Sequence, residues 1–279
     1  MSETWRSGEA PHEGPIPPAG WLRVVLKGVP MAVVTFGCLA LLLLLRLVER
    51  PFFGARRPVT PHITRFVCRT NLAILGLKLR VEGKPLAGGG AQVANHSSWL
   101  DIFVLNAPQT VYFVSKAEVA GWPGIGWLAR ATGTVFIRRS RAEAREQVAL
   151  FEERLAQGHK LLFFPEGTST DGLRVLPFKS TLFAAFFSDA LRDTALIQPV
   201  SLRYIAPDGE DARLYGWWGD MDFGPHLIRT LAARRQGEVR VTFHSPLKVA
   251  EARDRKDLAL RLEEAVRGPF VAAGLTERD

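Results

Sequence analysis

The sequence predicts an α/β domain whose mixed, largely parallel sheet is flanked by helices and preceded by one N-terminal membrane helix. Short apolar segments alternate with helical patterns from Leu79 onward, which is typical of such a sheet. One uncharged apolar run precedes this alternation, and the chain shows no internal repeat. The 279 residues are enough for one large domain and an anchor. We therefore expect a disordered tail at 1–27, a membrane helix at 28–50 and one folded domain at 60–279.

The N-terminal tail is rich in proline and glycine and poor in large apolar residues, which predicts disorder. No charge occurs between Lys27 and Arg46, a length near the minimum for a helix that spans a bilayer. A cleaved signal peptide is the main alternative. It is disfavoured because the run is long, begins well inside the chain and is followed by no small-residue cleavage site.

Arginines are more numerous after the apolar run than before it. By the positive-inside rule this places the folded domain in the cytoplasm, at the inner membrane if the protein is bacterial. The next segment, His62 to Leu79, has the pattern of an amphipathic helix. Periodicity alone leaves two positions open for this helix, at the lipid surface or packed on the core.

The net charge of +8 and the sequence pI of about 9.9 favour an anionic partner, either nucleic acid or an anionic membrane. The basic residues are spread along the chain rather than interleaved with aromatic residues in one patch, so we expect no nucleic acid. Cys38 and Cys68 are the only cysteines, and neither has neighbours at metal-ligand spacing. We expect no disulfide and no metal site.

The expected strands are short apolar segments, and the expected helices are longer segments between them. The strands are Leu79–Val81, Gln92–Ala94, Val111–Val114, Val135–Ile137, Leu161–Phe164, Ile197–Leu202 and Val239–Phe243. The helices are Trp99–Leu105, Ala142–Gln157, Ser180–Leu191 and Asp254–Val266. Sheets of this class carry their sites where loops leave the strand ends.

One such loop holds a candidate general base. Asn95-His96-Ser97-Ser98-Trp99-Leu100-Asp101 connects a strand to a helix start, with Ser97 or Ser98 as the expected N-cap. Asp101 then lies in the first turn and reaches back to His96. A carboxylate that accepts the Nδ1 proton of an imidazole leaves Nε2 free as a base. The alternative is a capped structural turn without chemistry.

Three further stretches leave strand ends. Arg138 to Arg141 follow an apolar strand and form either an anion pocket or a solvated charge run. Phe164 to Thr170 expose Glu166 next to Gly167, and Lys179 begins the following helix, where it would meet an anion. The strand from Ile197 carries Pro199, which predicts an edge or a bulge.

Taken together, these four stretches resemble the ordered motifs of the glycerolipid acyltransferases, the lysophosphatidic acid acyltransferase family. Asn-His-Ser-Ser-Trp-Leu-Asp matches the His-x4-Asp signature, and Phe136-Ile137-Arg138-Arg139 resembles the second block. Phe164-Pro165-Glu166-Gly167-Thr168 matches the third block and Gln198-Pro199-Val200 the fourth. The resemblance covers roughly residues 80 to 205. One departure is Ser169, where many relatives have arginine.

The resemblance implies a 1-acylglycerol-3-phosphate O-acyltransferase. His96 and Asp101 would form the general base, Arg139 and Lys179 would hold the phosphate of a lysophospholipid, and Glu166 and Gly167 would bind the acceptor. Acyl-CoA or acyl carrier protein would be the co-substrate, with no bound cofactor. Lysophosphatidic acid is the first expected acceptor, and a lyso-ornithine lipid is an alternative that the missing arginine at Ser169 favours.

Among the other function classes, a membrane-bound serine hydrolase lacks support because the chain has no Gly-x-Ser-x-Gly elbow. A non-catalytic lipid-binding module would account for the charge and the anchor, but not for His96, Asp101 and Glu166 at strand exits. The aromatic stretch from Tyr215 to Met221 lies outside the four blocks, and we expect core packing there rather than a lipid-facing edge.

Overall fold

The computed structural model describes residues 4–6, 14–137 and 144–275. They contain a sheet with the strand order β1-β7-β6-β2-β5-β3-β4, and β8 pairs with β6. The strands are β1 (Lys78–Gly83), β2 (Gly90–Ala94), β3 (Tyr112–Lys116), β4 (Val135–Ile137), β5 (Lys160–Phe163), β6 (Leu196–Ile205), β7 (Glu238–Phe243) and β8 (Leu247–Lys248). Neighbouring strands are parallel, except that β6 runs antiparallel to β7 and β8. The predicted fold class is confirmed.

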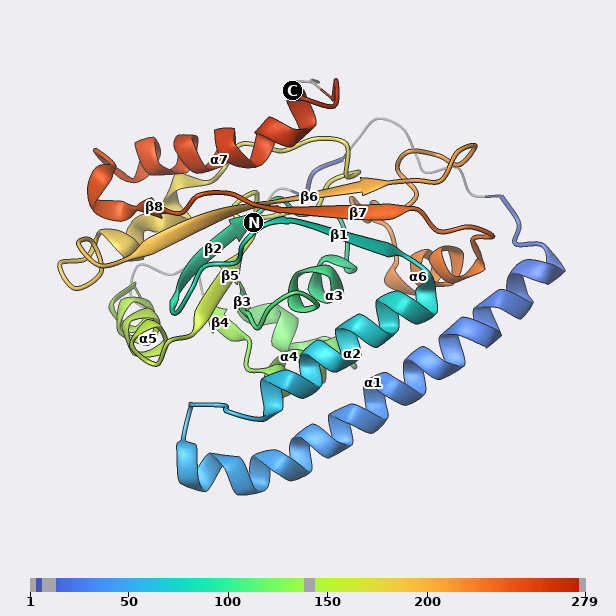
Figure 1. The fold of residues 1–279 in the computed structure, drawn as a ribbon, viewed down its shortest axis with the longest axis horizontal. Helices are drawn as coiled ribbons and strands as arrows, with labels where there is room; N and C mark the ends of the chain where they lie inside the picture. Colours follow the sequence, from blue (N-terminus) through green and yellow to red (C-terminus); the bar gives the residue numbers. More distant parts are fainter. Residues whose placement is uncertain (1–3, 7–13, 138–143, 276–279) are drawn as a thin grey trace.

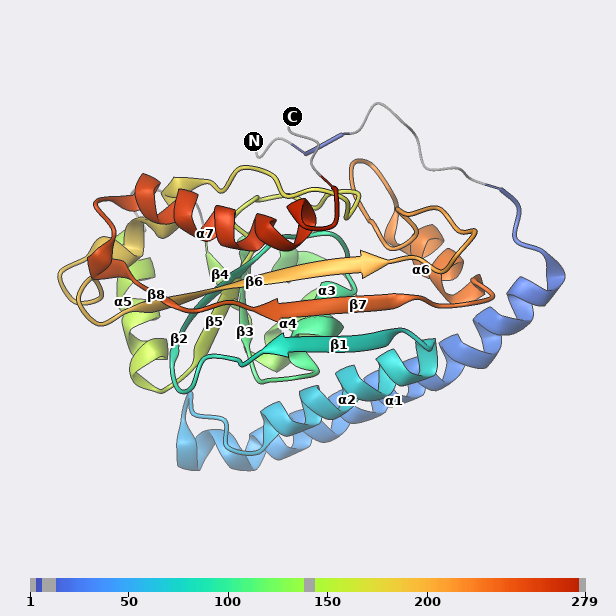
Figure 2. The same cartoon turned by 45° about the horizontal axis from the view of Figure 1, so that its top comes forward.

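Helices cover both faces of the sheet (Figure 1). The α-helices are α1 (Pro18–Phe53), α2 (Thr60–Leu75), α3 (Asp101–Asn106), α4 (Ile125–Thr132), α5 (Ala144–Ala156), α6 (Phe223–Ala232) and α7 (Arg255–Val271). Short 3₁₀ helices are η1 (Ala117–Gly121), η2 (Ser180–Phe187) and η3 (Val249–Glu251). In both views α7 lies on one face, while α1, α2 and α3 lie on the other (Figure 2).

The buried strand β2 shows how the two faces are filled. Its side chains alternate in direction, as they must in a strand. Val93 belongs to the apolar cluster under α7, together with Leu262 and Val266. Ala94 belongs to the opposite cluster, which includes Leu75 of α2 and Leu105 of α3. The turn that follows β2 therefore leaves the sheet from its centre, with packed helices on both sides.

Several predicted boundaries differ from the structure. Helix α1 starts at Pro18, so residues 18–27 are helical rather than part of a disordered tail. The segment from Ser180 is a 3₁₀ helix instead of an α-helix. Helices α4 and α6 were not predicted. The expected core packing of the 215–221 aromatics is confirmed, because Tyr215 and Trp218 are buried.

The sequence predicted that Pro199 lies on an edge strand or at a bulge. The edge position is wrong, because β6 has neighbouring strands on both sides. Proline is tolerated here because the partner on one side changes. Pairing with β7 extends to Val200 opposite Phe243, and pairing with β8 begins at Ile197 opposite Leu247. Pro199 lies in the gap between these two ladders, where its missing N–H removes no ladder hydrogen bond.

Helix α1 runs along α2 and presents a long apolar surface (Figure 1). Its 36 residues span about 54 Å at the usual rise per residue. The stripe that faces the protein contains the buried residues Gly20, Met31, Leu42 and Glu49. Glu49 fixes the start of α2 by accepting hydrogen bonds from Val59 N, Thr60 N and the Thr60 hydroxyl.

The outer surface of α1 has the composition of a membrane segment. Val33, Leu44 and Leu47 are 63–72% exposed, and an 18-residue window has a mean hydropathy of 2.5. Helix α2 has mixed surroundings. Leu72 and Leu75 pack in the core, while Phe66 is exposed. One face of α2 therefore packs on the domain, which was one of its two predicted positions.

Candidate active site

The turn between β2 and α3 brings His96 and Asp101 together, as the sequence predicts. His96 Nδ1 lies 2.7 Å from Asp101 Oδ2. The Asp101 side chain is fully buried, whereas the His96 side chain is 23% exposed. A carboxylate at Nδ1 favours the tautomer with its proton on that nitrogen, so the Nε2 lone pair is available to accept a proton.

Backbone amides of the same turn hold the Asp101 carboxylate. Ser97 N and Ser98 N donate to Oδ2 at 2.9 and 3.1 Å. The expected N-cap at Ser97 or Ser98 is wrong, because Leu100 precedes α3 and no side chain caps the helix. Asp101 is itself the first helical residue, so its carboxylate takes amides that the turn leaves free. Its other oxygen, Oδ1, accepts from the Tyr204 hydroxyl at 2.7 Å.

Glu166 braces the backbone of His96. Its Oε2 accepts from His96 N at 2.6 Å and its Oε1 from Leu176 N at 2.7 Å. The side chain is buried, with 1% exposure. Burial raises the pKa of Glu166 well above its ordinary value, against the two amide donors, and the charge of Asp101 raises it further. The family resemblance implies that Glu166 binds the acceptor, whereas in the structure both of its oxygens accept hydrogen bonds from backbone amides.

Phe164 covers one face of the His96 ring. The two ring centroids are 4.1 Å apart with planes 13° from parallel. Phe113 stacks on Phe164 in turn, with ring centroids 6.0 Å apart. The loop after Glu166 also supports His96, because Thr170 N donates to His96 O at 2.9 Å. Stacking on Phe164 and the contact of Nδ1 with Asp101 restrict rotation of the imidazole, and the bonds to His96 N and O fix its backbone.

The other predicted site residues lie in the same loop system or outside the described residues. Gly167 has a φ of +76°, a left-handed conformation that favours glycine. Lys179 precedes η2 and is half-buried. Its backbone N donates to Pro165 O at 3.0 Å, and Pro165 is the residue before Glu166. Arg139 lies outside the described residues.

The sequence and the fold both have known relatives. The family described as Acyltransferase matches residues 78–203. A lyso-ornithine lipid O-acyltransferase of Rhodobacter capsulatus is 57% identical over 263 residues, which cover 94% of this chain and 95% of the relative. The chain belongs to the glycerolipid acyltransferase family.

Two other relatives of this acyltransferase differ in what they establish. The 1-acyl-sn-glycerol-3-phosphate acyltransferase of Neisseria meningitidis serogroup B is 34% identical over 204 residues, covering 71% of this chain and 77% of that protein. The crystal structure of the 1-acyl-sn-glycerophosphate acyltransferase PlsC from Thermotoga maritima matches with a TM-score of 0.57 and 20% identity. The structural match covers 91% of this chain and 100% of the PlsC chain, and it establishes the fold.

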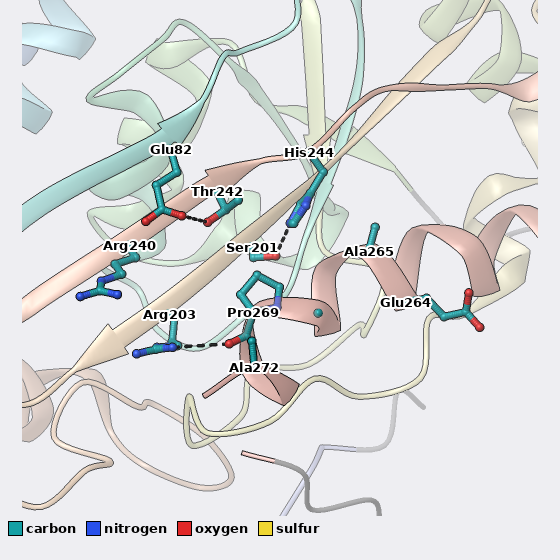
Figure 3. A pocket seen from close by; sticks show the side chains of 11 residues that line it. Glu82, Ser201, Arg203, Arg240, Thr242, His244, Glu264, Ala265, Pro269 and Ala272 are labelled. Carbon is teal, nitrogen blue, oxygen red and sulfur yellow. Dashed lines mark hydrogen bonds between the residues drawn. The ribbon is translucent and has the colours of Figure 1, made fainter. Parts of the chain in front are cut away.

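A surface cavity of about 490 Å³ lies beside α7 of the acyltransferase, and its lining includes no residue of the His96–Asp101 turn (Figure 3). Ser201 Oγ and His244 Nε2 are 2.7 Å apart at this cavity. Ser201 Oγ is also 2.8 Å from Val266 O. A carbonyl only accepts, so the hydroxyl donates to Val266 and accepts from His244. The hydroxyl proton is thus not directed to the imidazole, and the pair lacks the arrangement of a serine nucleophile and its base.

Tertiary contacts that sequence reasoning did not identify complete the support of the turn. Tyr204 bonds Asp101, and Trp99 Nε1 donates to His226 Nδ1 of α6 at 2.9 Å. Burial lowers the pKa of His226 to about 4, which keeps this nitrogen available as an acceptor. The fourth motif supports the strand that leads into the turn, because Gln198 Oε1 accepts a hydrogen bond from Gln92 Nε2 of β2. One signal in the sequence could have identified Tyr204. It follows Leu202 by two residues on β6, so the two side chains lie on the same face of the strand and in the same buried cluster.

The role of Glu166 leads to a prediction. Replacing Glu166 by alanine leaves His96 N and Leu176 N without their partners, and each unsatisfied buried donor costs about 1–3 kcal/mol. We expect a clear drop in melting temperature together with reduced kcat. Glu166→Gln keeps the size of the side chain but turns one amide donor toward a backbone N–H, so we expect a smaller drop of the same kind.

Thermal unfolding and steady-state kinetics on the same preparations check this prediction. Glu153, an exposed acidic residue of α5, is the matched control, and Glu153→Ala should change neither quantity. If Glu166→Ala unfolds at the wild-type temperature and only raises the acceptor KM, Glu166 contacts the acceptor and does not brace the loop.

Proposed function

We propose that this acyltransferase is a lyso-ornithine lipid O-acyltransferase, which moves a fatty acyl group from a thioester to the free hydroxyl of a lyso-ornithine lipid. The supporting observation is the 57% identity with the Rhodobacter capsulatus enzyme along 94% of this chain. The acyltransferases with a 1-acyl-sn-glycerol-3-phosphate acceptor are more distant, at 34% identity over 71% of the chain in Neisseria meningitidis. Lysophosphatidic acid, our first expectation from sequence, becomes the second candidate.

In the proposed reaction, His96 Nε2 takes the proton of the acceptor hydroxyl while the hydroxyl oxygen attacks the thioester carbonyl carbon. The new C–O bond forms and the carbonyl oxygen becomes an oxyanion. Collapse of this intermediate breaks the C–S bond, and protonated His96 returns the proton to the thiolate. Asp101 stabilises the imidazolium throughout. The acceptor is itself the nucleophile, so the step needs no covalent acyl-enzyme.

The headgroup of a lyso-ornithine lipid is compatible with serine, rather than arginine, at position 169. An ornithine headgroup carries a carboxylate and an ammonium, whereas lysophosphatidic acid carries a phosphate that favours several cations. Ser169 stands, half-buried, where many relatives have arginine. We propose that Lys179 and Arg139 contact the headgroup carboxylate and that Gly167 allows the acceptor to approach the backbone. Acyl-CoA or acyl carrier protein is the proposed donor.

The apolar α1 and the lipid acyltransferase relatives support membrane association. We propose that the domain faces the cytoplasm, because arginines are concentrated after the apolar run, at positions 46, 50, 56, 57, 65 and 69. Of these arginines, Arg50, Arg56 and Arg69 are exposed, and we propose that they and the exposed Phe66 of α2 contact an anionic membrane surface.

Deleting residues 1–50 should weaken membrane binding without abolishing it, since α2 and its arginines remain. We expect the truncated protein to sediment with anionic vesicles at low salt and to be released at high salt, whereas the full-length protein stays bound in both. Vesicles of neutral lipid are the control. A full-length protein that stays in the supernatant would exclude α1 as an anchor.

Release of free thiol from the acyl donor tests the proposed function. The full-length protein in detergent is supplied with acyl-CoA or acyl carrier protein and with no acceptor, lyso-ornithine lipid or lysophosphatidic acid. We expect thiol release to require an acceptor and to have the higher kcat/KM with lyso-ornithine lipid. Release without an acceptor would instead identify a hydrolase, and a higher kcat/KM with lysophosphatidic acid would identify the second candidate.

A further inference from the structure

Tyr204 is the penultimate residue of β6, and its side chain contacts the proposed general-base pair of His96 and Asp101. Its hydroxyl is 2.7 Å from Asp101 Oδ1, although the two residues are 103 positions apart. Tyr204 is 5% exposed and Asp101 is fully buried. The contact therefore joins the sheet directly to the carboxylate, in a place where water does not compete for the hydrogen bond.

The two oxygens of Asp101 are held differently. Oδ2 lies within hydrogen-bond distance of His96 Nδ1, Ser97 N and Ser98 N. Among the described residues, the hydrogen bond to Oδ1 comes from Tyr204. Burial raises the pKa of Tyr204 well above its ordinary value, and the Asp101 charge raises it further. The phenol thus keeps its proton and is the donor in this contact.

We propose that Tyr204 is a positioning residue of the acyl transfer, acting through Asp101 on His96. This inference rests on the proposed function. The hydrogen bond fixes the rotation of the carboxylate, so that Oδ2 stays in line with His96 Nδ1 while Nε2 accepts the acceptor proton. It also draws negative charge toward Oδ1, which weakens the hold of Oδ2 on the imidazolium and favours return of the proton to the leaving thiolate.

Tyr215 offers a matched comparison within the same core. It is fully buried, and its ring centroid lies 5.5 Å from that of Tyr204. Its hydroxyl donates to Gln236 Oε1 at 3.0 Å and accepts from Gly237 N at 2.6 Å. Removing either hydroxyl deletes one buried polar atom and leaves the ring in place. Only Tyr204 contacts the proposed catalytic carboxylate.

The test compares Tyr204→Phe with Tyr215→Phe in the full-length protein. Without this hydrogen bond the carboxylate can rotate away from His96 Nδ1, and such a misplacement lowers kcat by about 10- to 100-fold, with acceptor and donor KM unchanged. We expect that loss for Tyr204→Phe. We also expect the acid limb of its kcat/KM profile to move to higher pH, since the carboxylate then holds the imidazolium more strongly. Tyr215→Phe should keep kcat within about twofold of wild type and change only thermal stability.

Two further variants separate positioning from a merely structural effect. In an Asp101→Asn background, Tyr204→Phe should lower kcat by less than about twofold, because the group that it positions is gone. 4-Aminophenylalanine at position 204 restores an N–H donor and should recover part of kcat. Melting temperatures of all variants show whether each is folded.

The proposal is overturned if Tyr204→Phe is folded and keeps wild-type kcat and pH profile. It is also overturned if the loss is as large in the Asp101→Asn background, or if Tyr215→Phe loses as much activity. The outcome is independent of acceptor identity. If the wild type prefers lysophosphatidic acid, the proposed function fails, and the same comparisons made with that acceptor still decide the role of Tyr204.

Discussion

Replacing His96 by alanine is expected to remove nearly all turnover, by about 10²–10⁴-fold in kcat, which is the usual contribution of general-base catalysis. The imidazole is the partly exposed member of the pair, while Asp101 is buried behind it. No neighbouring side chain of the turn supplies another base, because the hydroxyls of Ser97 and Ser98 do not accept protons at neutral pH. Acyl transfer from a labelled donor, measured at saturating acceptor, checks this prediction.

Ser98 provides the control for His96→Ala. Its Oγ accepts from Leu100 N at 3.3 Å, so Ser98→Ala should cost about 1 kcal/mol of stability for the lost hydrogen bond and keep most activity. Both variants should remain folded. If Ser97→Ala or Ser98→Ala is folded and as inactive as His96→Ala, a serine nucleophile is involved and the proposed mechanism is wrong.

Asp101→Asn should cost a similar order of kcat, up to about 10⁴-fold by analogy with the tautomer effect in catalytic triads. The carboxylate accepts from Ser97 N, Ser98 N and Tyr204 at once. An amide has one acceptor oxygen, and if that oxygen faces the backbone amides the NH₂ group faces Tyr204. If the NH₂ group turns toward His96, Nδ1 must accept, and the proton moves to Nε2, where it blocks the base.

Thermal unfolding of Asp101→Asn, measured beside its activity, distinguishes loss of the base from general damage to the fold. We expect thermal unfolding within a few degrees of wild type, because the volume is conserved and most contacts remain. Wild-type activity in a folded Asp101→Asn protein would show that the carboxylate does not orient His96. Asp257→Asn, at an exposed ion pair of α7, is the matched control and should retain activity.

The local part of the site was predictable from sequence, and the tertiary part was not. His96 and Asp101 lie within one turn, so spacing and helix-start rules bring them together. Glu166 is 70 positions from His96, and its direction depends on how β5 lies beside β2. Sequence places its carboxylate at a strand exit but does not show that backbone amides take both oxygens. Tyr204 depends in the same way on the register of β6.

The fold shows a similar division. The apolar strands were recognisable because each is short and bounded by polar or turn residues. Helix α6 was missed because Gly224 and Pro225 indicate a loop, yet they occupy its first turn, where proline is tolerated. Helix α4 lies between Gly124 and Gly133 and is only eight residues long. The 3₁₀ geometry of η2 differs from an α-helix in hydrogen-bond spacing, which its largely apolar sequence does not encode.

A competition assay tests the central claim most directly. The full-length protein receives one labelled acyl donor and equal mole fractions of lyso-ornithine lipid and lysophosphatidic acid in the same micelles. The ratio of the two labelled products equals the ratio of kcat/KM values and does not depend on the active fraction. We predict that acylated ornithine lipid predominates and that His96→Ala lowers the formation of both products by about 10²-fold or more. Predominance of phosphatidic acid, or product formation by His96→Ala at a rate near that of wild type, would contradict this account.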